Sequence, residues 1–178
     1  VIDIRNFAQS DFYLVDFMIW NQLIRSPDQV RRRIALALTE FFVVNVDNMT
    51  EPWFKSFHIA KYFEILCDNA FGNFRKLLED VTLSVAMGSF LNTLRNEKED
   101  PATGRQPDEN YAREVMQLFT LGVSQLNIDG TPKLDSGGNP LDTYNQSDVT
   151  NLARVFTGYD TDQNAGFTKS PVPPFFFT

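Results

Sequence analysis

Residues 107–122 read PDENYAREVMQLFTLG, and this stretch decides the fold class. Its apolar side chains recur at helical spacing on one side and its polar side chains occupy the other, the pattern of an amphipathic helix. Pro107 suits the first turn of such a helix, where a backbone N–H would have no partner in any case. Gly122 suits the left-handed residue that follows a helix end. The stretch predicts a helix over residues 108–120.

Other segments carry the same helical signals. Apolar side chains at helical spacing, Ser26 and Pro27 at a helix start, and Asn145 as a cap predict further helices. We expect them over residues 11–24, 27–46, 52–68, 74–91 (as one or two helices) and 145–157. Segment 34–46 is apolar on nearly every side, which predicts a helix buried on several sides. The predicted fold class is therefore mainly α, a multi-helix globular domain.

The composition changes over residues 126–144. Asp129-Gly130 and Gly137-Gly138-Asn139 are typical turn sequences of β-hairpins, and short mixed segments flank them. We predict a small β-hairpin insert around residues 126–144, within an excursion over residues 123–146. The chain shows no fixed-period repeat.

The length of 178 residues predicts one domain. We interpret residues 1–178 as a single helical domain. We also interpret the chain as a fragment of a longer one, because Val1 is not an initiator Met and the last residues are strongly apolar. We expect the tail, residues 160–178, to contact segments outside this chain.

Charge and composition exclude several classes of function. With 16 Lys and Arg against 23 Asp and Glu, the net charge is −7, and such a surface repels nucleic acid. The basic run Arg31-Arg32-Arg33 is typical of a solvated helix face. Cys67 is the only cysteine and His58 the only histidine, which excludes an intrachain disulfide and a multi-histidine metal site. Nucleotide motifs and apolar runs of about 18 residues are absent, so we expect no cofactor and no transmembrane segment.

The polar face of the helix over residues 108–120 is the candidate for chemistry. It carries Glu109, Asn110, Arg113 and Glu114, and side chains four residues apart are neighbours on a helix. Three interpretations stay open: a solvated face with ordinary ion pairs, a buried polar network between helices, or a catalytic pair of carboxylates. A carboxylate beside an arginine is held ionised, which suits a nucleophile or base better than an acid.

A wider polar network follows from the segment 34–46, which Glu40 interrupts. A buried carboxylate costs several kcal/mol unless it is paired, so Arg33 or another arginine should meet Glu40. The proposed network comprises Glu40, Arg33, Glu109, Arg113, Glu114 and Arg154. We favour a covered face, in which the guanidinium of Arg113 bonds both Glu109 and Glu114, and expect Arg113→Ala to destabilise the domain severely.

One acidic loop resembles a calcium site. Asp160, Asp162 and Asn164 place oxygen ligands at alternating positions. The following glycine comes one residue late for an EF-hand loop, and Pro171 stands where a bidentate glutamate belongs. We therefore expect a solvent loop and no metal.

Six segments together resemble the bacterial domain-of-unknown-function family 1800. They read AFGNFRKLL (70–78), AMGSFL (86–91), PDENYAREVMQLFTLG (107–122), LNIDGT (126–131), TY (143–144) and ARVFTG (153–158). The resemblance runs in order from about Arg31 to Tyr159. It implies a longer parent chain and export from the cytoplasm, often with a second exported family, similar to sulfatases and alkaline phosphatases, encoded nearby. It implies no particular reaction.

These observations lead to two hypotheses of function. The first is an exported, extracytoplasmic binding or assembly module, in which a structural cluster of Glu109, Asn110, Arg113 and Glu114 organises a helix junction. Its partner would be another exported protein or an envelope glycan. The alternative is a carboxylate hydrolase, with polysaccharide as a possible substrate, that uses Glu109 or Glu114 beside Arg113 and Asn110.

Overall fold

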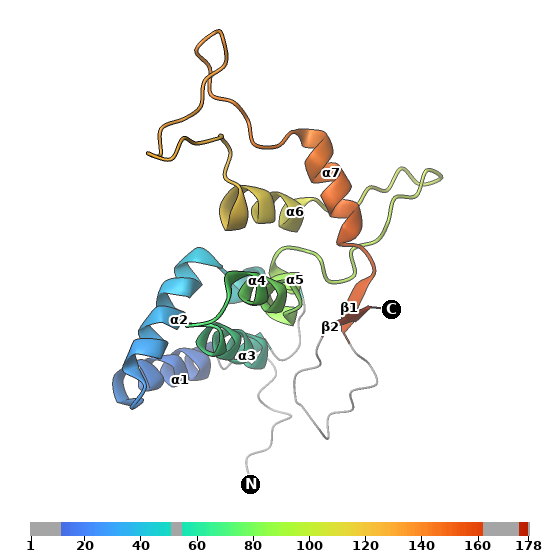
Figure 1. Cartoon of the computed structure of the whole chain (residues 1–178). Coiled ribbons are helices and arrows are strands. Elements are labelled where there is room, and N and C mark those ends of the chain that lie inside the picture. Colours follow the sequence, from blue (N-terminus) through green and yellow to red (C-terminus); the bar gives the residue numbers. More distant parts are fainter. Residues whose placement is uncertain (1–11, 51–54, 162–174, 178) are drawn as a thin grey trace. The chain divides into compact units, whose positions relative to one another are not determined.

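The chain is mainly helical in a computed structural model that describes residues 12–50, 55–161 and 175–177, as the sequence predicts (Figure 1). The helices are α1 (Phe12–Arg25), α2 (Gln29–Phe41), η2 (Val46–Asn48), α3 (Lys55–Asp68), α4 (Phe74–Thr82), α5 (Val85–Phe90), α6 (Asn110–Glu114), η3 (Val115–Thr120) and α7 (Gln146–Val155). They fall into two compact units, one of residues 1–94 and 159–178 and one of residues 95–158. Whether these units act as one domain stays a prediction.

Helix α3 is the centre of the first unit. It contacts α1, α2, α4 and α5 (Figure 1). Its buried side chains are His58, Tyr62, Phe63, Leu66 and Cys67. The Tyr62 hydroxyl donates a buried hydrogen bond of 2.8 Å to the carbonyl oxygen of Phe42, just beyond α2. Burial of these large side chains on one helix makes α3 the element on which the other helices pack.

Two arginines of α2 bind the end of α3. The Nη1 group of Arg31 donates to the carbonyl oxygen of Cys67 at 2.9 Å, and Nη1 of Arg32 donates to the Cys67 sulfur at 2.8 Å. The last carbonyls of a helix lack partners within it and attract cations, which accounts for the Arg31 contact. The Arg31 guanidinium also lies 5.0 Å from the ring centre of Phe71. These two arginines therefore join helices instead of forming a solvated face, whereas Arg33 is exposed.

The expectation that segment 34–46 forms a helix buried on several sides is wrong. Helix α2 begins at Gln29, ends at Phe41, and buries Ala35 alone among its residues. Its main helix neighbours are α1 and α3, and its Phe41 ring also contacts Phe74 of α4, with ring centres 6.5 Å apart. Glu40 is exposed, so its carboxylate stays in water and needs no partner.

The second unit is built on α6 and α7. Its core comprises Ala112, Val149 and Ala153, with Met116, Tyr144, Leu152 and Phe156 packed against it. Tyr111 adds an edge-to-face contact with Phe156, with ring centres 4.9 Å apart. Asn145 caps α7 in a reciprocal capping box with Asp148, which confirms the predicted cap.

The helix predicted over residues 108–120 changes character at Val115. The π-helix η3 begins there, with an i to i+5 hydrogen bond of 2.9 Å from the Leu121 amide to the Met116 carbonyl. The wider turn rotates the residues that follow, which explains why Leu118, expected on the apolar face, is 57% exposed while Phe119 is buried. Gly122 has φ of 76°, the left-handed conformation predicted for it.

The excursion over residues 123–144 is not the predicted β-hairpin. Three backbone hydrogen bonds of 2.8 Å form a closed triangle: Gln125 N–H to Leu141 O, Leu141 N–H to Lys133 O, and Lys133 N–H to Gln125 O. The three segments around Gln125, Lys133 and Leu141 are paired with one another only by isolated β-bridges. No two of them therefore form a continuous β-ladder. Tight turns at Gly130 and Gly138, both with φ of 84°, connect the segments.

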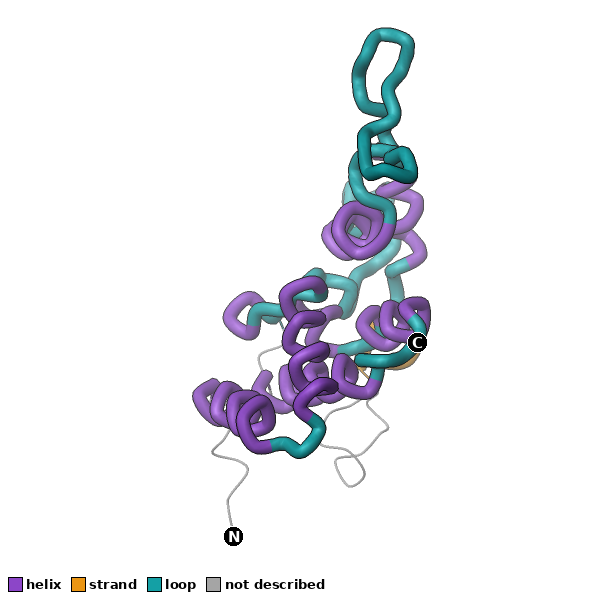
Figure 2. Tube along the Cα trace, turned by 60° about the vertical axis from the view of Figure 1, so that its left-hand side comes forward, coloured by secondary structure: helices purple, strands orange, loops and turns teal. Residues whose placement is uncertain are grey.

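The triangle exposes a short repeat that the sequence analysis missed. Its corners are eight residues apart, and LNIDGTP (126–132) occupies the same positions as LDSGGNP (134–140). In both views of the chain the excursion projects away from α6 and α7 (Figures 1 and 2).

Asn96 connects three parts of the second unit. Its side-chain amide donates to the carbonyls of Asp108 (3.3 Å) and Phe156 (3.1 Å), and its side-chain oxygen accepts from the Asp108 amide at 2.9 Å. Its own carbonyl accepts from the Gly158 amide at 2.9 Å. One buried side chain therefore fixes the residues that precede α6 and the residue that follows α7.

Strand β1 (Tyr159–Thr161) pairs antiparallel with β2 (Phe175–Phe177), and Tyr159 lies opposite Phe177. Residues 162–174 and 178 of the predicted tail lie outside the described residues, so its contacts stay a prediction. Within the described part of the chain, no helix is long and apolar enough to span a membrane.

We predict that Asn96→Ala lowers the free energy of unfolding by about 1–3 kcal/mol, because it removes one acceptor and two donors from a buried site. Urea denaturation measures the loss. Asn48→Ala, at an exposed position of η2, is the control and should cost less than about 0.5 kcal/mol. Equal losses in the two variants would show that Asn96 does not fix the unit.

Candidate functional site

The carboxylate of Glu109 binds donors from two helices. Its Oε2 accepts hydrogen bonds from Arg113 Nη2 at 2.9 Å and from Gln146 Nε2 at 2.8 Å. Its Oε1 accepts from the Thr150 hydroxyl at 2.7 Å. Arg113 Nη2 also donates to Gln146 Oε1 at 3.2 Å. We call Glu109, Arg113, Gln146 and Thr150 the Glu109 cluster.

Helix geometry positions each member of the Glu109 cluster. Glu109 is the N-cap of α6, and Arg113 lies four residues later on the same face. Gln146 and Thr150 are likewise four residues apart on α7, whose first turn is fixed by the Asn145 capping box. One turn of α6 therefore faces one turn of α7, with the carboxylate between them.

Hydrogen bonds hold the pKa of Glu109 below its ordinary value of 4.5. The bond from Thr150 is the largest cause, followed by the bond from Gln146, while the positive charge of Arg113 adds a smaller effect. The carboxylate is therefore ionised at neutral pH. Such a group accepts hydrogen bonds and is a poor proton donor.

The Glu109 cluster is partly exposed to solvent and is not covered by another helix as the sequence analysis expects. The side chains of Glu109 and Arg113 are 29% and 41% exposed. Exposed ion pairs contribute less than about 1 kcal/mol, so the severe effect expected for Arg113→Ala becomes a loss of that smaller size. The expectation that Arg113 bonds both Glu109 and Glu114 is also wrong, because its guanidinium bonds Glu109 and Gln146.

Glu114 occupies a separate position, immediately before the π-helix η3. Its Oε2 is buried and has no hydrogen-bond partner among the described residues. Single π turns are rare and occur frequently at functional sites. A buried carboxylate oxygen beside such a turn makes Glu114 the second candidate residue of this unit.

Asn110 and Arg154 do not bond Glu109 in the structure. Asn110 is exposed, and its backbone amide bonds the Asp108 carboxylate at 2.8 Å. Arg154 pairs with Glu99 at 3.2 Å and bonds Asn151 at 2.7 Å. Glu40 and Arg33 belong to the first unit and are both exposed, and their part in the network stays a prediction.

Sequence reasoning missed Gln146 and Thr150. They lie 37 and 41 residues beyond Glu109, so only the packing of α6 on α7 brings them to it. The sequence does contain one indication of their role. Gln146 and Thr150 follow the cap Asn145 and are four residues apart, so they share one face of the helix. Nothing in the sequence indicates which carboxylate that face meets.

The calcium candidate lies mainly beyond the described residues. Asp160 is in β1, where its carboxylate accepts the Thr161 amide at 2.7 Å, while Asp162 and Asn164 are outside the described ranges. Residues 12–50, 55–161 and 175–177 contain no group of three side chains arranged to hold a metal ion. The expectation that this loop is a solvent loop without a metal stays a prediction.

The fold and the Glu109 cluster define a mainly α protein with a carboxylate-bound helix junction. A model of one protein family matches residues 5–177, nearly the whole chain, and its description is "Protein of unknown function (DUF1800)". The chain belongs to this family. Neither a curated protein nor a solved structure matches it.

We predict that Glu109 makes the folded protein less stable as the pH falls into the acidic range. A lowered pKa in the folded state adds stability that is complete above the ordinary value of 4.5 and is lost as the pH falls through the lowered value. Melting temperatures of the wild type and Glu109→Gln should differ most near pH 7 and converge towards about pH 3. Glu79→Gln, at an exposed position of α4, is the control. A constant difference across this range would contradict the assignment.

Proposed function

We propose that this chain is a binding or assembly module that contacts a partner protein through the excursion over residues 123–144. The observation that supports the proposal is a set of exposed aliphatic side chains in the excursion and in the end of η3 that precedes it. Its members are Leu118, Leu121, Val123, Leu126, Ile128, Leu134 and Leu141. Contiguous exposed apolar surface in a protein typically marks an interaction site.

The chemistry of the excursion favours a protein partner over a glycan. Sugar-binding surfaces stack aromatic rings against the sugar, and the one aromatic side chain of residues 123–144, Tyr144, packs against the core of the unit. Two of its carboxylates are occupied within their own turns, because Asp129 bonds Thr131 and Asp135 accepts the amides of Gly137 and Asn139. The excursion therefore offers a partner five exposed aliphatic side chains, Val123, Leu126, Ile128, Leu134 and Leu141.

The Glu109 cluster gives the excursion a fixed base. The excursion begins after η3 and ends before α7, and its two ends are joined by a hydrogen bond of 3.1 Å from the Thr143 amide to the Val123 carbonyl. The Glu109 carboxylate also bonds both helices, joining the start of α6 to the first turns of α7. A surface anchored in this way loses less conformational entropy on binding than a free loop does.

Export of the chain is part of the proposal, and its support is the family resemblance given above. The partner would then be a second exported protein, in an extracytoplasmic compartment. The net charge of −7 agrees with a partner that is not nucleic acid.

A carboxylate hydrolase is the second candidate function, and Glu114 is the observation that favours it. A buried carboxylate oxygen without a hydrogen bond is typical of groups kept for chemistry. Glu109 fits that role less well, because both of its oxygens already accept hydrogen bonds. Hydrolysis of a polysaccharide by the purified chain, abolished in Glu114→Gln, would replace the binding proposal.

We predict that the double variant Leu126→Ser, Ile128→Ser weakens partner binding at least about tenfold, because the two changes remove about two buried aliphatic contacts. The partner is first identified by cross-linking in native extract, and its affinity is then measured by calorimetry. Both side chains are exposed, so the melting temperature should not change. Ile24→Ser, at an exposed position of α1, is the matched control and should bind like the wild type. Unchanged affinity in the double variant would overturn the proposal.

A further inference from the structure

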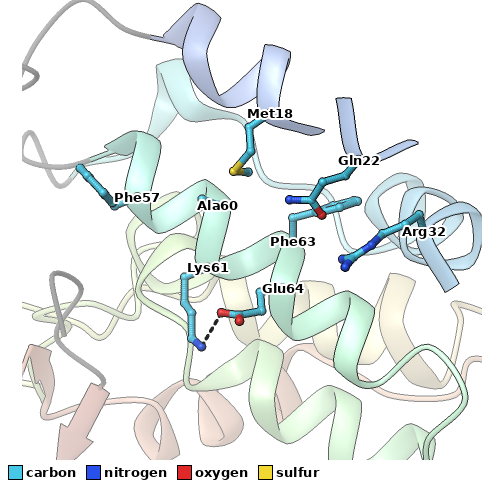
Figure 3. Close-up of a pocket in the computed structure, with 8 residues that line it drawn as sticks. All are labelled: Met18, Gln22, Arg32, Phe57, Ala60, Lys61, Phe63 and Glu64. Carbon is cyan, nitrogen blue, oxygen red and sulfur yellow. Dashed lines mark hydrogen bonds and ion pairs between the residues drawn. The ribbon is translucent and has the colours of Figure 1, made fainter. Parts of the chain in front are cut away.

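A pocket of about 330 Å³ lies among α1, α2 and α3 in the first unit (Figure 3). Its walls include the apolar side chains of Met18, Phe57 and Phe63. Its polar lining comes from Gln22 on α1, Arg32 on α2, and Lys61 and Glu64 on α3. Both the size and the mixture of an apolar wall with few polar groups are typical of small-molecule sites.

The pocket carries one positive charge that no carboxylate neutralises. Lys61 also lines it, but its ammonium is paired with Glu64 at 2.7 Å (Figure 3). Arg32 forms no ion pair with any described residue; its Nη1 bonds the sulfur of Cys67, and its Nε is buried without a hydrogen-bond partner. Burial raises the pKa of the Cys67 thiol above its ordinary value of 9.0, so that thiol is neutral near pH 7 and supplies no counter-charge.

A buried, unpaired guanidinium nitrogen is costly in an apolar setting. An anion within the pocket would offset that cost, because Coulomb attraction strengthens as water is excluded. Gln22 adds a second polar atom without a partner, since its Oε1 is also buried and unbonded within the described part of the chain. The two atoms lie in the lining of one pocket, next to apolar side chains.

We propose that this pocket binds a small apolar carboxylic acid in its ionised form, with the carboxylate at Arg32 and the apolar group against Met18, Phe57 and Phe63. Arginine is suited to this task because its planar fork matches a carboxylate. The site belongs to the first unit and does not depend on the partner surface proposed for the second unit.

The proposal is tested with two probes of equal shape, 3-phenylpropionate and its neutral amide, by titration calorimetry on the intact chain. We expect the acid to bind at least about tenfold more tightly than the amide, because only the acid offers a charge to Arg32. Equal affinities would overturn the proposal. Absence of binding by the acid at millimolar concentration would overturn it as well.

Three variants test whether the acid binds in this pocket. Arg32→Gln should remove the preference for the acid, while Arg33→Gln, the same change at the exposed neighbour, should leave it intact. Because Arg32 also bonds Cys67, its variant could fail to fold, and Ala60→Leu provides a second test by filling the pocket from α3 without altering charge. Ala60→Leu should weaken the acid at least about tenfold. Full affinity in this variant would place the probe elsewhere and overturn the assignment.

Discussion

The carboxylate of Glu109 connects two helices of the second unit that the chain separates by a long excursion. Its donors come from one turn of α6 and one turn of α7, at 2.7–2.9 Å. A carboxylate can accept several charge-assisted or hydroxyl hydrogen bonds at once, so one group can serve both helices. The small core of Ala112, Val149 and Ala153 lies between the same helices. Met116, Tyr144, Leu152 and Phe156 pack against this core, so the polar contact adds to apolar packing between two short helices.

The features that the sequence predicts correctly are local ones. The cap at Asn145 and the left-handed Gly122 depend on a few neighbouring residues, and both are present. Features that depend on distant packing were missed. Gln146 and Thr150 bond Glu109 only because α7 lies against α6, and how much of α2 is buried depends on how α1 and α3 pack against it. The eight-residue repeat escaped notice because its shared letters are turn residues, which any pair of loops can share.

The two units offer different chemistry. The first unit surrounds α3, where Arg31 and Arg32 bind the end of that helix, and Arg32 also lines the pocket of about 330 Å³. The second unit has exposed aliphatic side chains on the excursion, and both carboxylate oxygens of its Glu109 already accept hydrogen bonds. Membership in the family of unknown function covers both units and assigns a reaction to neither. The proposals of a partner surface and of a carboxylate-binding pocket therefore stand on separate residues and can fail separately.

The central claim is that Glu109 couples α6 to α7, and a double-mutant cycle between Glu109→Gln and Thr150→Val tests it most directly. Thr150 is the donor from the second helix with the shortest bond to the carboxylate, 2.7 Å. The free energies of unfolding of the wild type, the two single variants and the double variant are measured in urea. The account predicts that the losses are not additive, with a coupling energy above about 0.5 kcal/mol. Additive losses within about 0.3 kcal/mol would contradict it, because the two side chains would then contribute independently.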